Sequence, residues 1–196
     1  MLSFGKLLRF FVYTYNNYII WRYPLLKNKN ISVTDLVRYS LLASLTGLLQ
    51  VSAALFPGPG NMLSFFSTLP IALAAYISPG GGLACAVISG WLTLVIRPIG
   101  LPAFALMMAP LGLITGIGLH YSVKRSGTIL AGAAAVTAGL LFITYVLGFP
   151  AFGYSLERST ILVALPFYAS FSMVYSYAWY NFIKKVINRL TRFIKL

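Results

Sequence analysis

Three side chains could support metal or acid–base chemistry, and they lie far apart in the sequence. The chain contains two acidic residues, Asp35 and Glu157, and a single histidine, His120. A hydrolytic metal centre needs such groups in a cluster, and a general base must lie within hydrogen-bond reach of the proton that it removes. The three residues fall in three different connecting regions. We therefore predict no metal site and no catalytic carboxylate pair.

The nucleophilic side chains are also poorly placed for catalysis. Ser89 and the lone cysteine, Cys85, lie within one apolar run, whereas His120 lies at the edge of another. A serine or cysteine nucleophile needs its base within hydrogen-bond reach. Their different positions in the runs separate the nucleophiles from the base, so we expect a protein that is not an enzyme and that uses no cofactor.

Polar and aromatic residues within or beside the apolar runs are better suited to binding. A polar group in apolar surroundings is costly and usually faces a cavity or a polar partner. We predict a ligand-binding set that comprises Gln50, Asn61, Trp91, Arg97, Tyr154, Arg158 and Tyr168. Simpler interpretations stay open, namely an interhelical hydrogen bond for Gln50, a snorkelling side chain for Arg97 and a solvated pair for Arg158 with its neighbour Glu157.

The composition indicates that most of the chain is surrounded by lipid. Hydrophobic residues make up 59% of the 196 residues, and charged residues only 9%, whereas soluble domains carry about 25% charged residues. The 15 lysines and arginines give a net charge of +13. A basic excess can indicate nucleic acid, but this chain is too apolar for that class. We expect the lipid bilayer, and no nucleic acid, as its surroundings.

Six apolar runs approach or reach the length of about 20 residues that a helix needs to cross a bilayer. They span residues 36–56, 62–78, 82–96, 101–119, 127–149 and 160–182. Proline and glycine separate several of them, as in the turns at Pro57–Asn61 and Pro79–Gly82. The predicted fold is all-α, a polytopic membrane protein whose bundle of six transmembrane helices occupies residues 33–182.

Both ends of the chain carry basic amphipathic sequence. Residues 1–32 combine an aromatic stripe with lysines and arginines, and residues 183–196 place basic residues between apolar ones at helical spacing. We expect both segments to lie in the membrane interface. For the first segment, docking of a partner protein is an alternative.

The basic residues also predict an orientation. All of them except Arg97 and Arg158 lie before or at the very start of the first apolar run, after the last one, or in the short loop that holds Lys124 and Arg125. Loops rich in lysine and arginine stay in the cytoplasm, so both termini should be cytoplasmic. Arg97 and Arg158 would then lie at the outer end, and a ligand that contacts both should be an anion or carry a carboxylate.

Small residues recur at four-residue spacing in two of the predicted helices. Ala43 and Gly47 form one pair, and Gly112 and Gly116 form another. Such pairs let two helices approach closely. We expect them mainly to pack helices within the bundle.

The order of the motifs resembles that of a known transporter family. A first helix with SLLASLTG at Ser40–Gly47 is followed by LSFFSTLP at Leu63–Pro70, by PGGG at Pro79–Gly82 and by GLITG at Gly112–Gly116. From about residue 33 to residue 182, the chain resembles the substrate-binding (S) components of energy-coupling factor (ECF) vitamin transporters. It is also similar to an uncharacterised family of bacterial membrane proteins related to them.

The resemblance implies a chain in the bacterial cytoplasmic membrane that binds a small, vitamin-like molecule near the outer surface. A transmembrane coupling subunit would dock on the small face of the first helix, at Ala43 and Gly47. Two cytoplasmic ATPases would drive release of the ligand. The alternative is a non-transporting membrane scaffold whose basic termini recruit a partner protein.

Overall fold

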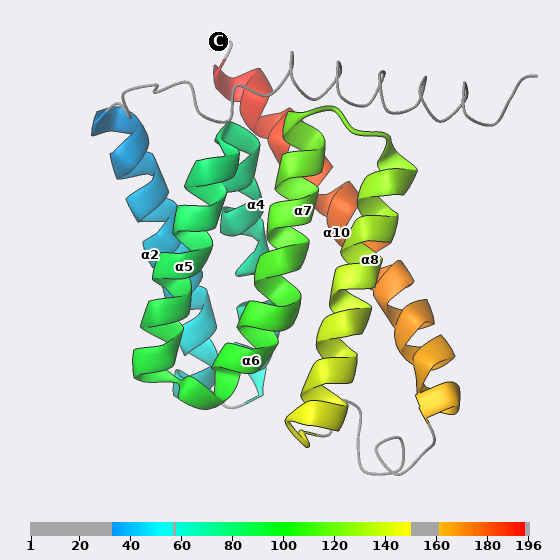
Figure 1. Cartoon of the computed structure of the whole chain (residues 1–196). Helices are drawn as coiled ribbons and strands as arrows, with labels where there is room; N and C mark the ends of the chain where they lie inside the picture. The colour runs from blue at the N-terminus through cyan, green and yellow to red at the C-terminus, as the bar shows by residue number, and fades with distance from the viewer. Residues whose placement is uncertain (1–32, 57, 150–160, 195–196) are drawn as a thin grey trace, which may run out of the picture. The chain divides into compact units, whose positions relative to one another are not determined.

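The computed structural model describes residues 33–56, 58–149 and 161–194. The chain divides into two compact units, residues 1–33 and 34–196, and the helices described below form the second unit, apart from the first residue of helix α2. The predicted amphipathic segment at residues 1–32 lies outside the described residues. The elements assigned in the described part are all helical, which agrees with the predicted all-α class (Figure 1).

Within the described part of the chain, five helical segments are long and apolar enough to cross a membrane. They are α2 (Val33–Leu55), α3 with α4 (Pro59–Phe65 and Thr68–Ile77), α5 (Pro79–Ile96), the segment Pro98–His120, and α8 with η3 (Arg125–Leu141 and Phe142–Val146). These segments agree with the first five predicted spans. A further helix, α10 (Ile161–Ile194), follows the residues that are not described, so the count of six spans stays a prediction.

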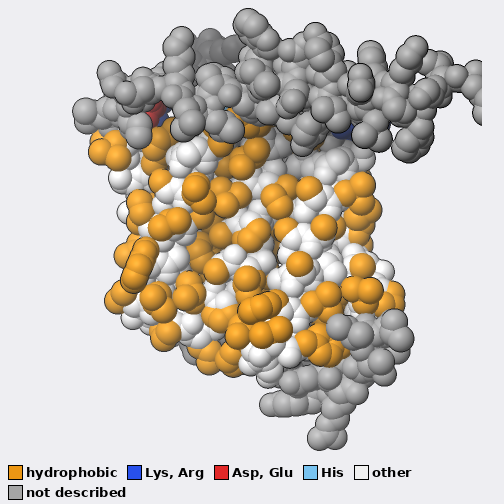
Figure 2. All heavy atoms as spheres, in the orientation of Figure 1, with side chains coloured by type: hydrophobic (Ala, Val, Ile, Leu, Met, Phe, Trp, Pro, Cys, Tyr) orange, Lys and Arg blue, Asp and Glu red, His pale blue; other side chains and the backbone are white. Residues whose placement is uncertain are grey.

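The helices run between two ends of the bundle (Figure 1). We call the end at which α5 finishes the Arg97 end, and the end at which α8 begins the Arg125 end. Figure 2 shows a side of the molecule on which hydrophobic side chains cover the surface between these two ends. An apolar belt of this kind is what contact with the hydrocarbon core of a bilayer requires.

Proline divides the second predicted span into two helices, α3 and α4. Pro70 has no N–H and cannot donate a hydrogen bond to the carbonyl of Phe66. Around this point the backbone changes to tighter hydrogen bonds, from Phe66 N to Leu63 O at 3.0 Å and from Leu69 N to Phe66 O at 3.0 Å. The prediction of one continuous helix over residues 62–78 is therefore corrected to two helices joined at residues 66–67.

Proline also interrupts the regular α-helix of the fourth predicted span, where one turn is the wider π-helix. This segment consists of η1 (Pro98–Gly100), α6 (Leu101–Ala103), the π-helical segment η2 (Phe104–Met108) and α7 (Ala109–His120). Pro110 cannot donate a hydrogen bond to the carbonyl of Leu106. That carbonyl faces Gly139 of α8, where a Cβ atom would overlap it. The π-helical turn thus lies where the backbones of η2 and α8 meet.

Small residues bring α7 against α4. A Cβ atom on Gly112 would lie 2.9 Å from the carbonyl oxygen of Thr68, and one on Gly116 would overlap the carbonyl oxygen of Ala72. The predicted small-residue pair in the fourth span is therefore used for packing within the bundle. Since lipid is as apolar as the side chains, such close contact is a main source of helix association in membranes.

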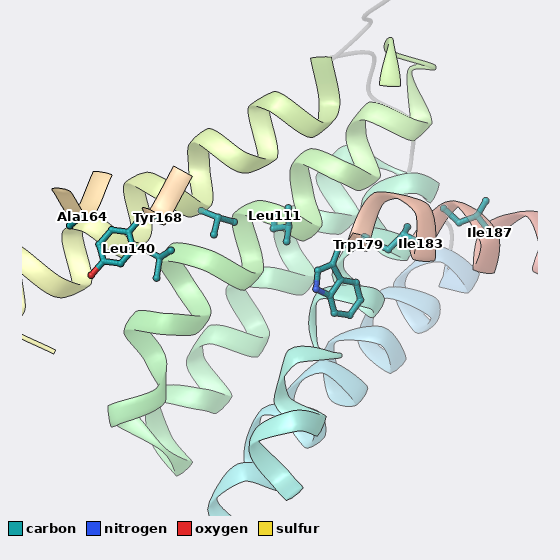
Figure 3. Packing of buried hydrophobic residues seen from close by; sticks show 9 residues of the cluster. Leu111, Leu140, Ala164, Tyr168, Trp179, Ile183 and Ile187 are labelled. Carbon is teal, nitrogen blue, oxygen red and sulfur yellow. The ribbon is translucent and has the colours of Figure 1, made fainter. Parts of the chain in front are cut away.

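The long helix α10 runs through the predicted boundary at residue 183. We expected a separate amphipathic helix at 183–196, but α10 continues without interruption to Ile194. Ile183 and Ile187 are buried in the same core cluster as Tyr168 and Trp179 (Figure 3). The apolar stripe that we assigned to the bilayer surface therefore packs, at these positions, on the other helices. The sequence between residues 167 and 194 contains no proline or glycine that would end the helix.

The contact between α7 and α4 predicts a stability difference between two glycine substitutions. Gly116→Ala should destabilise the protein by about 1–3 kcal/mol, because the new methyl group would overlap backbone that cannot move aside easily. Gly127→Ala is the matched control, since Gly127 lies at the exposed start of α8 and its nearest neighbour would be 3.8 Å away. Thermal unfolding in detergent, followed by circular dichroism, measures both. Equal transition temperatures would contradict this account of the contact.

Candidate functional site

Two of the predicted ligand-binding residues meet at the Arg97 end. Arg97 directly follows α5, and Asn61 lies in the first turns of α3. The Arg97 Nη2 atom donates a hydrogen bond to Asn61 Oδ1 at 3.4 Å, at the long limit for such a bond. The acid in the described part of the chain, Asp35, forms an ion pair with Arg38 at the start of α2, so it does not neutralise Arg97. The guanidinium group of Arg97 is thus placed to receive an anion.

Glycine and serine fix the turn that carries Asn61. Gly58 has a φ of 92°, which an L-amino acid with a side chain rarely adopts. Gly60 lies directly against the carbonyl of Ser52, and the Ser52 hydroxyl donates a hydrogen bond to the Gly60 carbonyl at 3.1 Å. The end of α2 and the start of α3 are therefore held in close contact, which fixes the position of Asn61 relative to α2.

A third predicted residue, Gln50, lies in a buried polar cluster. Its side chain is 2% exposed. The Nε2 atom donates hydrogen bonds to Ser67 Oγ at 3.2 Å and to Met108 Sδ at 3.0 Å. These contacts join α2 to the junction of α3 and α4 and to the end of η2. They are the interhelical hydrogen bonds that the sequence left open as the simpler interpretation of Gln50.

The remaining predicted ligand residues do not join this group. Trp91 is 65% exposed on the outer surface of α5. Tyr168 is fully buried between helices, and its hydroxyl lies 3.2 Å from Thr144 Oγ1 of η3. Tyr154 and Arg158 lie outside the described residues. The structure therefore brings Asn61 and Arg97 together, with Gln50 in the interior and Trp91 turned toward the surroundings.

The pair that we expected to dock a coupling subunit is covered by α5. Ala43 is 1% exposed, and its carbonyl accepts a hydrogen bond from Ser89 Oγ at 3.1 Å. Gly47 is also buried, and a Cβ atom there would lie 2.9 Å from Leu92 Cδ1. Docking through Ala43 and Gly47 stays a prediction, but it would require α2 and α5 to separate first.

The sequence did not lead us to a basic cavity at the Arg125 end. This cavity has a volume of about 370 Å³, and its lining includes Tyr76, Ser122, Arg125, Tyr180, Lys184 and Asn188. Lys124 and Arg125 were used only to predict orientation, and Lys184 only to predict contact with the leaflet. The signal that could have indicated the cavity is the run of tyrosines at Tyr175, Tyr177 and Tyr180, which Lys184 and Lys185 follow.

Backbone strain marks one edge of this cavity. Ser122 has a φ of 52°, in the left-handed region that usually favours glycine. It ends α7 through two hydrogen bonds, Val123 N to Gly118 O at 2.8 Å and Ser122 N to Leu119 O at 3.3 Å, the pattern of a Schellman cap. Ser122 thus adopts a backbone conformation that would cost less free energy for a glycine.

Comparisons of the chain with protein-family models, with curated proteins and with solved structures found no match. Function is therefore inferred from the geometry described above and from the resemblance of the sequence motifs.

The interhelical role of Gln50 predicts a loss of stability when its amide is removed. Gln50→Leu should destabilise the protein by about 1 kcal/mol, the typical contribution of a hydrogen bond between membrane helices. Ser44→Ala, on the exposed face of the same helix, should have no effect. Thermal unfolding in detergent measures both variants, and an unchanged transition temperature for Gln50→Leu would show that the amide contributes nothing to packing.

Proposed function

We propose that this chain is a membrane-embedded binding subunit for a small anionic molecule, of the type found as the S component of ECF transporters. The observation that carries the proposal is the position of Arg97. Its guanidinium group lies beside Asn61 at one end of the bundle, and no acidic side chain in the described residues contacts it. A guanidinium group and a neighbouring amide form a pair of donors suited to a carboxylate or a phosphate.

The backbone around Arg97 supports a binding role. The helices are irregular toward this end, with the break between α3 and α4, the 3₁₀ turn η1 and the π-helical segments η2 and η3. Segments of π-helix occur frequently at functional sites, and interrupted helices commonly form the ligand sites of membrane transporters. Irregular backbone of this kind is a poor choice for packing alone, because it leaves carbonyl groups without their helical partners.

The remaining parts of the proposal come from the resemblance. The chain would bind a vitamin-like molecule at the Arg97 end and would hydrolyse nothing itself. A transmembrane coupling subunit and two cytoplasmic ATPases would supply the energy. The Arg125 end would face the cytoplasm of a bacterial cell, because lysine and arginine accumulate on that side.

One observation favours the alternative, a non-transporting scaffold that recruits a partner through its basic residues. The docking face that the resemblance implies, Ala43 with Gly47, is covered by α5. Most of the described basic side chains lie instead at the Arg125 end, in the residues Arg38, Lys124, Arg125, Lys184, Lys185 and Arg189. A partner of a scaffold would be expected to bind there.

The binding role predicts that small molecules are retained by the purified protein in an Arg97-dependent way. Mass spectrometry of compounds released from detergent-purified protein should detect one anionic molecule per chain. Arg97→Ala should lower its retention at least tenfold, because a hydrogen bond to a charged group is worth about 1.5–3 kcal/mol. Asn61→Ala should give a smaller loss. Lys185→Ala, which removes an exposed charge from α10, should retain the compound fully.

A purified protein that contains no bound compound would favour the alternative function, a membrane scaffold. If no compound is released, and a panel of vitamins and carboxylates causes no change in thermal stability, then the Arg97 end does not bind small anions. The search would then turn to proteins that co-purify with the chain through the Arg125 end.

The proposed orientation predicts a difference in labelling from the two sides of the membrane. In a Cys85→Ala background, Ile99→Cys at the Arg97 end should react in intact cells with a thiol reagent that cannot cross membranes. Ser126→Cys at the Arg125 end should react only after the cells are opened. Both positions are exposed in the structure, so access to the reagent and not burial decides the result. The opposite pattern would reverse the orientation.

A further inference from the structure

The positive charge of the cavity at the Arg125 end has no acidic partner among the residues that the structure describes. The chain holds two acidic residues. One of them, Asp35, forms its ion pair with Arg38 at 3.7 Å, and the other, Glu157, lies outside the described residues. Arg125 and Lys184 both line the cavity. A basic cavity at a membrane edge attracts an anion from its surroundings, and anionic lipid head groups are the anions concentrated there.

Aromatic rings and an amide hold Arg125 in place. Its guanidinium group lies 5.0 Å from the ring centre of Tyr177 and 6.0 Å from that of Tyr180. Its Nη2 atom donates a hydrogen bond to Asn181 Oδ1 at 3.0 Å. The Lys184 ammonium group lies 6.0 Å from the ring centre of Tyr180 on the same helix. These contacts orient both cations without neutralising either of them, since tyrosine and asparagine carry no charge.

An apolar groove begins beside this cavity and continues along α8 and α10. It has a volume of about 370 Å³ and is lined by Ser126, Ile129, Leu130, Met173, Val174 and Tyr177. Val174 is 70% exposed on the groove. Tyr177 lines the groove and Arg125 lines the cavity, and their contact places the groove next to the cavity.

The groove extends in the direction that a lipid chain would take. Leu130 follows Arg125 by five residues, which places it about 7.5 Å further along α8, toward the middle of the apolar segment Arg125–Val146. A cationic cavity at the membrane edge and an apolar groove leading into the membrane match the two parts of an anionic phospholipid. A free phosphate ion would use only the cavity.

We propose that the Arg125 end contains a binding site for one anionic phospholipid. Arg125 and Lys184 bind the phosphate group of the lipid, and Ser122 and Asn188 lie beside the head group. One acyl chain occupies the groove between α8 and α10. This site is independent of the ligand proposed for the Arg97 end, and either proposal can fail without the other.

The test compares two lipids with identical acyl chains on the full-length protein. The protein is purified in detergent, depleted of lipid and incubated with phosphatidylglycerol or phosphatidylcholine, and bound lipid is counted by native mass spectrometry. We expect one phosphatidylglycerol per chain and much weaker binding of phosphatidylcholine. Arg125→Ala combined with Lys184→Ala should weaken binding of phosphatidylglycerol about 30-fold, or about fivefold for each charge. Equal binding of the two lipids by the unchanged protein would overturn the proposal.

A matched variant separates this site from a general effect of charge. Lys185→Ala with Arg189→Ala removes two exposed cations from the same helix and should change the affinity less than threefold. If this control weakens binding as much as the Arg125 and Lys184 variant does, the lipid is held by overall charge and the proposal is wrong. Lys184→Ala alone serves where loss of Arg125 impairs folding, because Lys184 is exposed and its contact with a described residue, the ring of Tyr180, is weak. It should still weaken binding about fivefold.

A third variant tests the groove. Val174→Trp should fill the groove and weaken binding of phosphatidylglycerol at least fivefold, with the cavity left intact. If Val174→Trp has no effect, or if inorganic phosphate at millimolar concentration displaces the lipid completely, the groove contributes nothing to binding and the proposed acyl-chain site is wrong.

Discussion

The close backbone contact of the fourth span with its neighbours is the constraint on which the rest of this bundle depends. Large apolar side chains gain little by leaving lipid for the interior of a membrane protein, so helices associate where their backbones can approach. Gly112 and Gly116 bring α7 against the carbonyls of α4, and Gly139 brings α8 against the carbonyl of Leu106. This segment is thereby held from two sides. The positions of α4, α8 and α10, and with them both ends of the bundle, follow from it.

The same constraint explains which parts of the fold the sequence could predict. The first five spans follow from apolar length and from proline and glycine turns, and their limits agree with the helices within a few residues. Pro70 and Pro110 indicate where hydrogen bonds must be missing, yet they do not decide how the chain responds. A tight turn forms at Pro70 and a wide π-helical turn before Pro110. The second response depends on Gly139, about 30 residues away in the sequence, which no local pattern reveals.

The candidate site was harder to predict because many side chains that face the interior of the bundle are small or weakly polar. On α5 the buried positions are Gly81, Gly82, Cys85, Ala86, Ser89 and Thr93, while Trp91 and Val95 face outward. Polarity therefore does not distinguish a ligand contact from a packing contact. Gln50 illustrates this, since its partners Ser67 and Met108 are distant in sequence. Arg97 and Asn61 could be paired because both lie at helix ends on the same side of the predicted topology.

The continuation of α10 past residue 183 was not predicted for a related reason. A basic amphipathic stripe predicts an interface between apolar and aqueous surroundings, but it does not identify the apolar partner. Either lipid or other helices of the protein can cover the apolar face of such a helix. In α10 the apolar positions continue in register from Tyr168 through Trp179 to Ile187, so the helix uses the bundle as its apolar partner over this stretch. At about 51 Å this helix is longer than the hydrocarbon core of about 30 Å, and its C-terminal part carries the cations of the Arg125 end.

The middle of the bundle bears on how a ligand at the Arg97 end could ever reach the other side. Ile71, Leu111 and Tyr168 are fully buried between the two ends. At Gly112 and Gly116 the backbones of α4 and α7 are in direct contact, so there is no gap between these helices for a ligand. Passage through this region would require whole helices to part, which would break the contacts that hold the bundle together. A chain built in this way is suited to binding at one end as a rigid unit. Movement of the ligand across the membrane would then have to come from reorientation of the whole chain against a partner. The proposed binding role therefore needs a coupling subunit as its partner. The burial of Ala43 and Gly47 bears only on which face that subunit would use.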